Sequence, residues 1–183
     1  NRCFFCKDEL YVHLSGFSKE EGYDFITNGT NVDDLGDFRP GLNAAKQYGV
    51  RSPLVDADLT KAEIRELSKG MGLPTWDKPA QACLSSRIPY GNMVTVEALT
   101  QIAKAEEYLH GLGIRQLRVR HHDTVARIEV EPQDFLALSD EETREQVVKK
   151  FKEIGYSYVT LDLQGFRSGS LNEVLAALKK RQA

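Results

Sequence analysis

Hydrophobic positions in the first half of the chain alternate between helical spacing and short extended runs. The spacing predicts helices over residues 7–21, 42–48 and 60–71, and short strands over residues 23–27 and 50–55. Thr60 and Glu63 have the spacing of a capping box, which marks the start of the third helix. Strands that alternate with helices favour an α/β fold with a parallel sheet.

The second half has a different pattern. The spacing predicts a helix over 96–112, a hairpin of strands 116–121 and 124–130 joined at residues 122–123, a helix from a second capping box at 139–142 to Ile154, a strand over 156–163, and a terminal helix from a box at Ser170 to Lys180. This order, α-β-β-α-β-α, is typical of a small α+β domain. Residues 74–93 contain three prolines and no periodicity, so we expect a domain boundary near Gly91. The domains would be 1–91 and 92–183.

Composition narrows the function classes. The chain has 183 residues, 41% of them hydrophobic, and a net charge of −3. A pI near 5.9 argues against a nonspecific nucleic-acid binder. No window approaches the roughly 18 apolar residues of a membrane span, and no secretion signal is visible. The first residue is Asn1 rather than Met, which suggests that an upstream part is absent.

Three cysteines are the first candidates for chemistry. Because Cys3, Cys6 and Cys83 cannot all pair, a disulfide scaffold is disfavoured and a reduced, cytoplasmic protein is expected. Cys3 and Cys6 lie one helical turn apart, a spacing that suits binding of a metal or a cluster, or a redox dithiol. The structural alternative is two half-buried cysteines beside aromatic core residues. Cys83 lies in the aperiodic connector, where the nearby Arg87 would favour its thiolate. Three cysteines together suit a 4Fe–4S cluster with one iron not bound by protein.

Two other groups of polar residues are candidates for ligand binding. The loop at residues 27–41 carries Asn31, Asp33 and Asp34, whose oxygens suit Mg²⁺ and a nucleotide's phosphates, although a solvated polar loop has the same composition. Arg118 and Arg120 alternate on a predicted strand and so share a face. They form either an anion site or a surface stripe.

Two further segments of the second half bear on ligands. Arg167 precedes the last predicted helix, whose N-terminus would help to hold an anion. His121, His122 and Asp123 do not suit a metal site, because adjacent strand residues face opposite ways, and we assign them to a turn.

Taken in order, several segments of the chain resemble the LarE family. They are residues 1–7, 27–41, 52–54, 59–65, 72–79, 82–91, 118–122 and 165–167. The resemblance covers nearly the whole chain. It implies a PP-loop ATP pyrophosphatase that acts as an ATP-dependent sulfur transferase. The implied fold is the C-terminal part of an adenine-nucleotide alpha hydrolase-like (PP-loop) parallel sheet, followed by a small α+β domain.

The resemblance also implies a reaction. ATP with Mg²⁺ adenylates a carboxylate of a pyridinium dicarboxylate mononucleotide, and sulfur then displaces AMP to give a thiocarboxylate, on the way to a nickel-pincer nucleotide. In one branch of the family a cysteine at the position of Cys83 gives up its own sulfur. In the other, three cysteines hold a 4Fe–4S cluster that carries the sulfide. Because it has Cys3 and Cys6 as well as Cys83, this sequence resembles the cluster branch.

The family resemblance assigns roles to individual residues. The implied roles are catalysis for Cys83, Lys7 and Arg87, cluster binding for Cys3, Cys6 and Cys83, substrate binding for Arg118, Arg120 and Arg167, and nucleotide binding for Asn31, Asp33 and Asp34. The family's Ser-Gly-Gly-x-Asp-Ser phosphate loop is not among these residues, and we expect it upstream of Asn1.

The resemblance suggests a cytoplasmic homo-oligomer. Two alternatives to sulfur insertion stay open. One is a tRNA-thiolating PP-loop enzyme, which the acidic pI disfavours. The other is a non-catalytic fragment that binds a nucleotide or a cluster.

Overall fold

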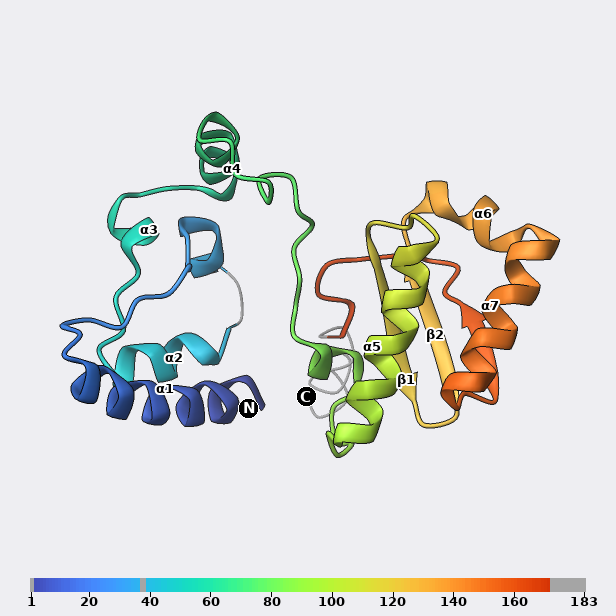
Figure 1. Cartoon of the computed structure of the whole chain (residues 1–183), viewed down its shortest axis with the longest axis horizontal. Coiled ribbons are helices and arrows are strands. Elements are labelled where there is room, and N and C mark those ends of the chain that lie inside the picture. Colours follow the sequence, from blue (N-terminus) through green and yellow to red (C-terminus); the bar gives the residue numbers. More distant parts are fainter. Residues whose placement is uncertain (1, 37–38, 172–183) are drawn as a thin grey trace, which may run out of the picture. The chain divides into compact units, whose positions relative to one another are not determined.

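The computed structural model describes residues 2–36 and 39–171 and divides into two compact units, Asn1–Lys78 and Pro79–Ala183 (Figure 1). This division precedes the boundary expected near Gly91. The reason is packing: Leu84 and Ile88 contact Ala98 and Ile102 of the second unit. The aperiodic connector therefore belongs mostly to the second unit.

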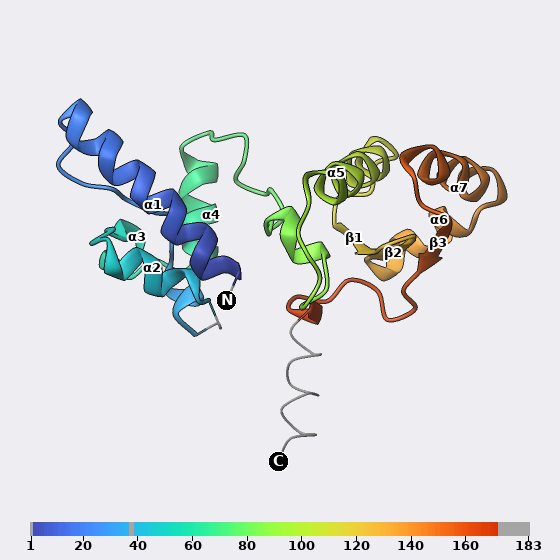
Figure 2. The same cartoon turned by 90° about the horizontal axis from the view of Figure 1, so that it is seen from below.

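The first unit is largely helical. Its described elements are α1 (Arg2–Glu21), the 3-10 turn η1 (Val32–Gly36), α2 (Gly41–Gln47), α3 (Pro53–Asp56) and α4 (Lys61–Gly70). Helices α1 and α2 lie side by side (Figures 1 and 2), and a small core around Tyr11, Ala44 and Ala45 joins them. Helix α1 begins five residues before the predicted start at residue 7, so Cys3 and Cys6 lie within it.

Extended pairing in the described part of the first unit is a single parallel bridge between Thr27 and Arg51. Two hydrogen bonds support it, from the Asn28 amide to the Arg51 carbonyl and from the Arg51 amide to the Ile26 carbonyl. The predicted strand over 50–55 is wrong beyond this bridge, because Pro53 at the first helical position starts α3. The chain is thus mixed α/β, and the expected PP-loop sheet stays a prediction.

Helix α4 begins where the sequence predicts. The Thr60 hydroxyl accepts a hydrogen bond from the Glu63 amide, and the Glu63 carboxylate accepts one from the Thr60 amide. This capping box satisfies two backbone donors that the helix itself leaves unpaired.

The second unit contains a three-stranded sheet. Its described elements are η2 (Leu84–Arg87), α5 (Val96–Gly111), β1 (Leu117–His122), β2 (Val125–Val130), η3 (Pro132–Asp134), α6 (Phe135–Ser139), α7 (Glu141–Ile154) and β3 (Tyr158–Leu161). Strand β2 lies in the middle, antiparallel to β1 and parallel to β3. Figure 2 shows α5 and α7 on one face of this sheet, and the chain that follows β3 on the other.

Alternation along β1 explains why the sheet has two different faces. Leu117 and Val119 point into the core, where they meet Leu109 of α5 and Phe151 of α7. Arg118 and Arg120 alternate with these two residues and therefore point to the opposite face of the sheet. Most of the predicted elements of this unit are therefore confirmed, since strands with one buried face read clearly from sequence.

Three details of the second unit differ from expectation. Strand β1 continues through His122, and the turn falls at Asp123, whose φ of 53° is left-handed. Asp140 caps α7 by accepting a hydrogen bond from the Thr143 amide, so the predicted box at Ser139 is wrong. Ser139 instead ends α6, which the sequence pattern missed.

Two further findings complete the fold. The last predicted helix falls almost wholly on residues 172–183, outside the described residues. No helix in the described ranges is long and apolar enough to cross a bilayer.

Candidate functional site

Cys83 lies at the N-cap position of the short turn η2 and is exposed. Its Sγ is 3.0 Å from the hydroxyl oxygen of Ser85. Cys3 and Cys6 are also exposed, and none of the three is in a disulfide. All three thiols are thus accessible to a ligand or a reagent.

Arg87 holds the backbone on both sides of Cys83. Its guanidinium is buried, and Nη1 donates to the carbonyls of Ala82 at 2.9 Å and Cys83 at 3.2 Å. Nε and Nη2 donate to the two carboxylate oxygens of Glu106, each at 2.8 Å. These bonds go to oxygen atoms of the protein, so Arg87 fixes the cysteine segment through its backbone.

Arg118 and Arg120 share a face of β1, as predicted, and both are buried, so the surface-stripe interpretation is wrong. Arg118 donates to the carbonyl of Ala80 at 2.7 Å, and Arg120 donates to the carbonyl of Ser86 at 2.8 Å. Together with Arg87, they bind carbonyls before, at and after Cys83. The sequence did not foresee that these arginines and the cysteine segment form one structural unit.

Positive charge exceeds negative charge among the buried side chains of the described ranges. Three guanidiniums, of Arg87, Arg118 and Arg120, face the two carboxylates of Glu106 and Glu129. Burial, and then the nearby Arg87, lower the pKa of Arg118. The Nε of Arg120 is buried without a hydrogen-bond partner in this part of the chain. Because unbalanced buried charge is costly, such a cluster is suited to an anion.

Residues 165–170 run along the same arginines. The ring of Phe166 lies 5.1 Å from the Arg118 guanidinium, and the Ser170 hydroxyl accepts a hydrogen bond from Arg120 at 2.7 Å. Arg167 lies between these two contacts and donates to the Gly165 carbonyl at 3.4 Å. The three arginines predicted to bind substrate therefore belong to one region of the second unit.

The first unit carries the other two cysteines. Cys3 and Cys6 lie in the first turns of α1, three residues apart. Lys7 follows them, exposed, with its Nζ 5.9 Å from the centre of the Tyr11 ring. A Cβ on Gly41 would lie 3.1 Å from Lys7 Cγ and 3.4 Å from the Cys3 carbonyl, so glycine permits the start of α2 to approach this turn closely.

The predicted nucleotide-binding residues are partly used within the fold. Asp33 accepts a hydrogen bond from the Lys61 amide at 2.8 Å, at the start of α4. Asp34 accepts one from the Asn31 amide at 3.2 Å and forms an ion pair with Arg39 at 2.8 Å. The side-chain oxygen of Asn31 is buried and has no hydrogen-bond donor among the described residues.

Two buried carboxylates, Glu106 and Glu129, escaped the sequence analysis, and His121, which it assigned to a turn, is buried on β1. His121 packs edge-on against Tyr156, with its Nδ1 3.1 Å from the tyrosine hydroxyl. Burial lowers the pKa of His121 and raises that of Tyr156 to about 12. The strand that carries the arginines is thus also anchored in the core by a neutral imidazole.

Unfolding of the second unit is expected to become easier as the pH falls below about 6.5, because unfolded His121 takes up a proton more readily than the buried one. One such proton contributes at most about 1.4 kcal/mol per pH unit. His121→Gln should flatten the dependence between pH 6.5 and 5, measured by urea unfolding followed by circular dichroism. The exposed His13→Gln serves as control, and equal slopes in both variants would contradict the assignment.

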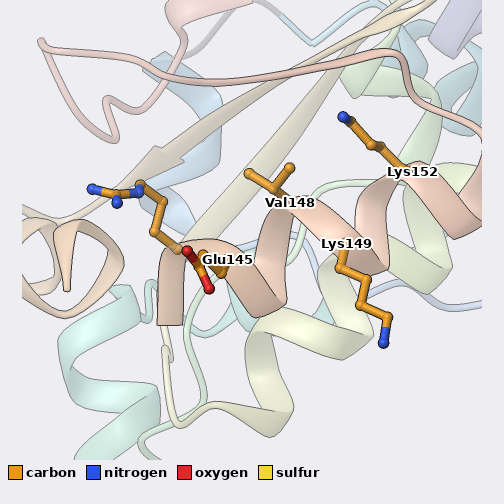
Figure 3. A pocket seen from close by; sticks show the side chains of 5 residues that line it. Glu145, Val148, Lys149 and Lys152 are labelled. Carbon is orange, nitrogen blue, oxygen red and sulfur yellow. The ribbon is translucent and has the colours of Figure 1, made fainter. Parts of the chain in front are cut away.

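A surface hollow on α7 does not involve the predicted residues. It is lined by Arg144, Glu145, Val148, Lys149 and Lys152 (Figure 3). In the described part of the chain, no three His, Cys, Asp or Glu side chains converge as a metal site. The candidate residues are therefore Cys3 and Cys6 in the first unit, and Cys83 with the arginine cluster in the second.

No protein-family model matches the chain. The chain is 48% identical over 175 residues to an uncharacterized protein of Synechocystis sp., a match that covers 96% of this chain and 65% of that protein. It is 38% identical over 175 residues to the pyridinium-3,5-bisthiocarboxylic acid mononucleotide synthase of Lactiplantibacillus plantarum, covering 94% and 62%. This similarity supports the resemblance to the LarE family.

A third relative, an uncharacterized protein of Methanocaldococcus jannaschii, is 32% identical over 167 residues, covering 91% of this chain and 64% of that protein. The chain thus spans slightly less than two thirds of each of these relatives. The name of the L. plantarum relative describes a synthase whose product is a pyridinium mononucleotide with two thiocarboxyl groups.

Proposed function

We propose that the chain belongs to the LarE family and takes part in ATP-dependent sulfur insertion into a pyridinium dicarboxylate mononucleotide. The similarity to a named synthase over 94% of the chain supports this proposal. In the proposed reaction ATP with Mg²⁺ adenylates a carboxylate. A C–S bond then forms at that carbon, the C–O bond to AMP breaks, and AMP leaves with the bonding electrons.

The observation that carries the proposal is the position of Cys83. This exposed thiol lies in a segment whose carbonyls are bound by three buried arginines with excess positive charge. In this proposal the sulfur-transfer residue and the anion-binding cluster belong to one unit. We assign the phosphate of the mononucleotide to Arg118, Arg120 and Arg167, since guanidiniums suit phosphate oxygens.

The three cysteines fit a 4Fe–4S cluster in their donor chemistry, because all are exposed thiols and two are spaced one helical turn apart. Cys3, Cys6 and Cys83 would hold it, and it would supply the sulfide. Lys7, next to Cys6 on α1, would add positive charge beside this site. Asn31, Asp33 and Asp34 are assigned to ATP. A cytoplasmic homo-oligomer completes the proposal.

The proposal is tested by anaerobic incubation of the chain with iron and sulfide. We expect visible absorption typical of a 4Fe–4S cluster, and its loss in Cys3→Ser, Cys6→Ser and Cys83→Ser. The exposed His13→Ala, also on α1, is the matched control and should keep the absorption. The loaded chain, supplied with the acyl-adenylate of the mononucleotide, should yield the thiocarboxylate and AMP by mass spectrometry.

Two results would contradict the proposal. A colourless chain whose Cys83 loses one sulfur atom during product formation would replace the cluster by a sacrificial cysteine. A chain that gives neither a cluster nor a thiocarboxylate from the acyl-adenylate would overturn the sulfur-insertion function itself.

A further inference from the structure

Glu106 is a buried carboxylate on the apolar side of α5. Its neighbours on that helix, Ile102, Ala105 and Leu109, are apolar core residues, and Glu106 is buried among them with only 7% of its surface exposed. A carboxylate at such a position is costly unless partners compensate its charge and satisfy its oxygens. Its contacts therefore show what it does in the fold.

The two oxygens of Glu106 bridge the two parts of the candidate site. Both accept hydrogen bonds from Arg87, the residue that holds the Ala82 and Cys83 carbonyls. Oε1 also accepts a hydrogen bond from the backbone amide of Val119 at 2.9 Å. One side chain thus connects the cysteine segment to the strand residue that lies between Arg118 and Arg120.

This arrangement is geometrically demanding. A bidentate guanidinium–carboxylate pair fixes both the distance and the plane of its partners. The third bond, to Val119, fixes the carboxylate along β1. An apolar side chain of the same volume would fill the space but would set neither relation.

We propose that Glu106 is a positioning residue that sets the place of Cys83 relative to the anion-binding arginines of β1. It acts through its hydrogen bonds with Arg87 and with the Val119 amide. The inference rests on the proposed function for its consequence in sulfur transfer, but the geometric claim concerns Cys83 and the arginines alone.

The sharpest variant is Glu106→Asp, because it keeps the charge and shortens the side chain by one methylene. Aspartate cannot reach Arg87 and Val119 together, so the cysteine segment should shift relative to β1. Glu107→Asp, the next residue on the exposed side of α5, is the matched control. Arg87→Lys tests the same link from its other end, since lysine cannot form the bidentate pair.

The readout is the alkylation of each cysteine, followed by peptide mass spectrometry, with iodoacetate and with neutral iodoacetamide. The excess positive charge near Cys83 should favour iodoacetate there, and Cys6 in the other unit serves as internal reference. The iodoacetate preference is the rate of alkylation by iodoacetate divided by the rate with iodoacetamide. We expect Glu106→Asp and Arg87→Lys to lower this ratio at Cys83 by about threefold or more, which is a part of the increase in local anion concentration that a positively charged site produces. Glu107→Asp should leave it unchanged.

The sulfur-transfer assay gives the functional arm. Glu106→Asp should reduce the single-turnover rate by about tenfold or more, since small misplacements of reacting groups are that costly. The inference would be overturned if the alkylation preference at Cys83 stayed unchanged in both variants while hydrogen exchange showed that the second unit was folded. A changed preference in a chain whose wild type transfers no sulfur would overturn only the proposed function and uphold the positioning role.

Discussion

Glu129→Gln is expected to lower the free energy of unfolding of the second unit by about 3 to 5 kcal/mol. The Glu129 carboxylate is fully buried and forms ion pairs with Arg120 at 2.7 Å and Arg127 at 3.2 Å. Glutamine fills the same space, but it carries no charge and turns an N–H toward one of the guanidiniums. Arg120 would then be a buried cation without its nearest counter-charge, and the penalty is that of an uncompensated ion.

The loss should be confined to one unit, which the sequence allows us to test. Hydrogen exchange of the amides of β1 and β2 reports on the second unit. The fluorescence of Trp76, the chain's one tryptophan, reports on the first unit. Glu153→Gln, which breaks the exposed pair with Lys150, is the control and should cost less than about 1 kcal/mol. A cost for Glu129→Gln within that range would show that the buried pairs are not needed for stability.

The second unit was largely predictable because its strands and helices each bury one side. The alternation of Leu117 and Val119 with arginines predicted β1, and the shared face of those arginines followed directly. The first unit was less predictable. Pro53 starts a helix where apolar residues indicated a strand, and a single bridge at Thr27 is the extended pairing among its described residues.

The sequence predicted which side chains of the site could carry chemistry, but it did not predict which residues they contact. Cys83 and the arginines stood out by residue type, whereas their joint packing depends on contacts far apart in the chain, such as Arg118 with Ala80. Glu106 did carry a signal, since it interrupts the apolar stripe of α5. Glu129 also carried one, because it faces Arg118 across the hairpin register. A charged residue on a core-facing or cross-strand position deserves to be interpreted as a partner in a buried network.

A glycine after β3 permits the chain to approach the end of β2 closely. Gly165 has a φ of +70°, and a Cβ there would lie 2.8 Å from the Val130 carbonyl oxygen and 3.4 Å from the Phe135 ring. The next amide, of Phe166, donates a 2.8 Å hydrogen bond to that same carbonyl. Because the obstacle is strand backbone, the chain at 165–166 must move instead.

Gly165→Ala should therefore destabilise the second unit by about 2 to 4 kcal/mol, the sum of left-handed strain and overpacking. Gly113→Ala is the matched control: its φ of +89° imposes the same kind of strain, but nothing lies within 4 Å of a Cβ there, so about 1 to 2 kcal/mol is expected. Urea unfolding followed by hydrogen exchange at β2 measures both, and equal costs would contradict the clash. The shift also moves Phe166 away from the Arg118 guanidinium. Gly165→Ala should therefore weaken sulfur transfer in the proposed reaction, whereas Gly113→Ala should not.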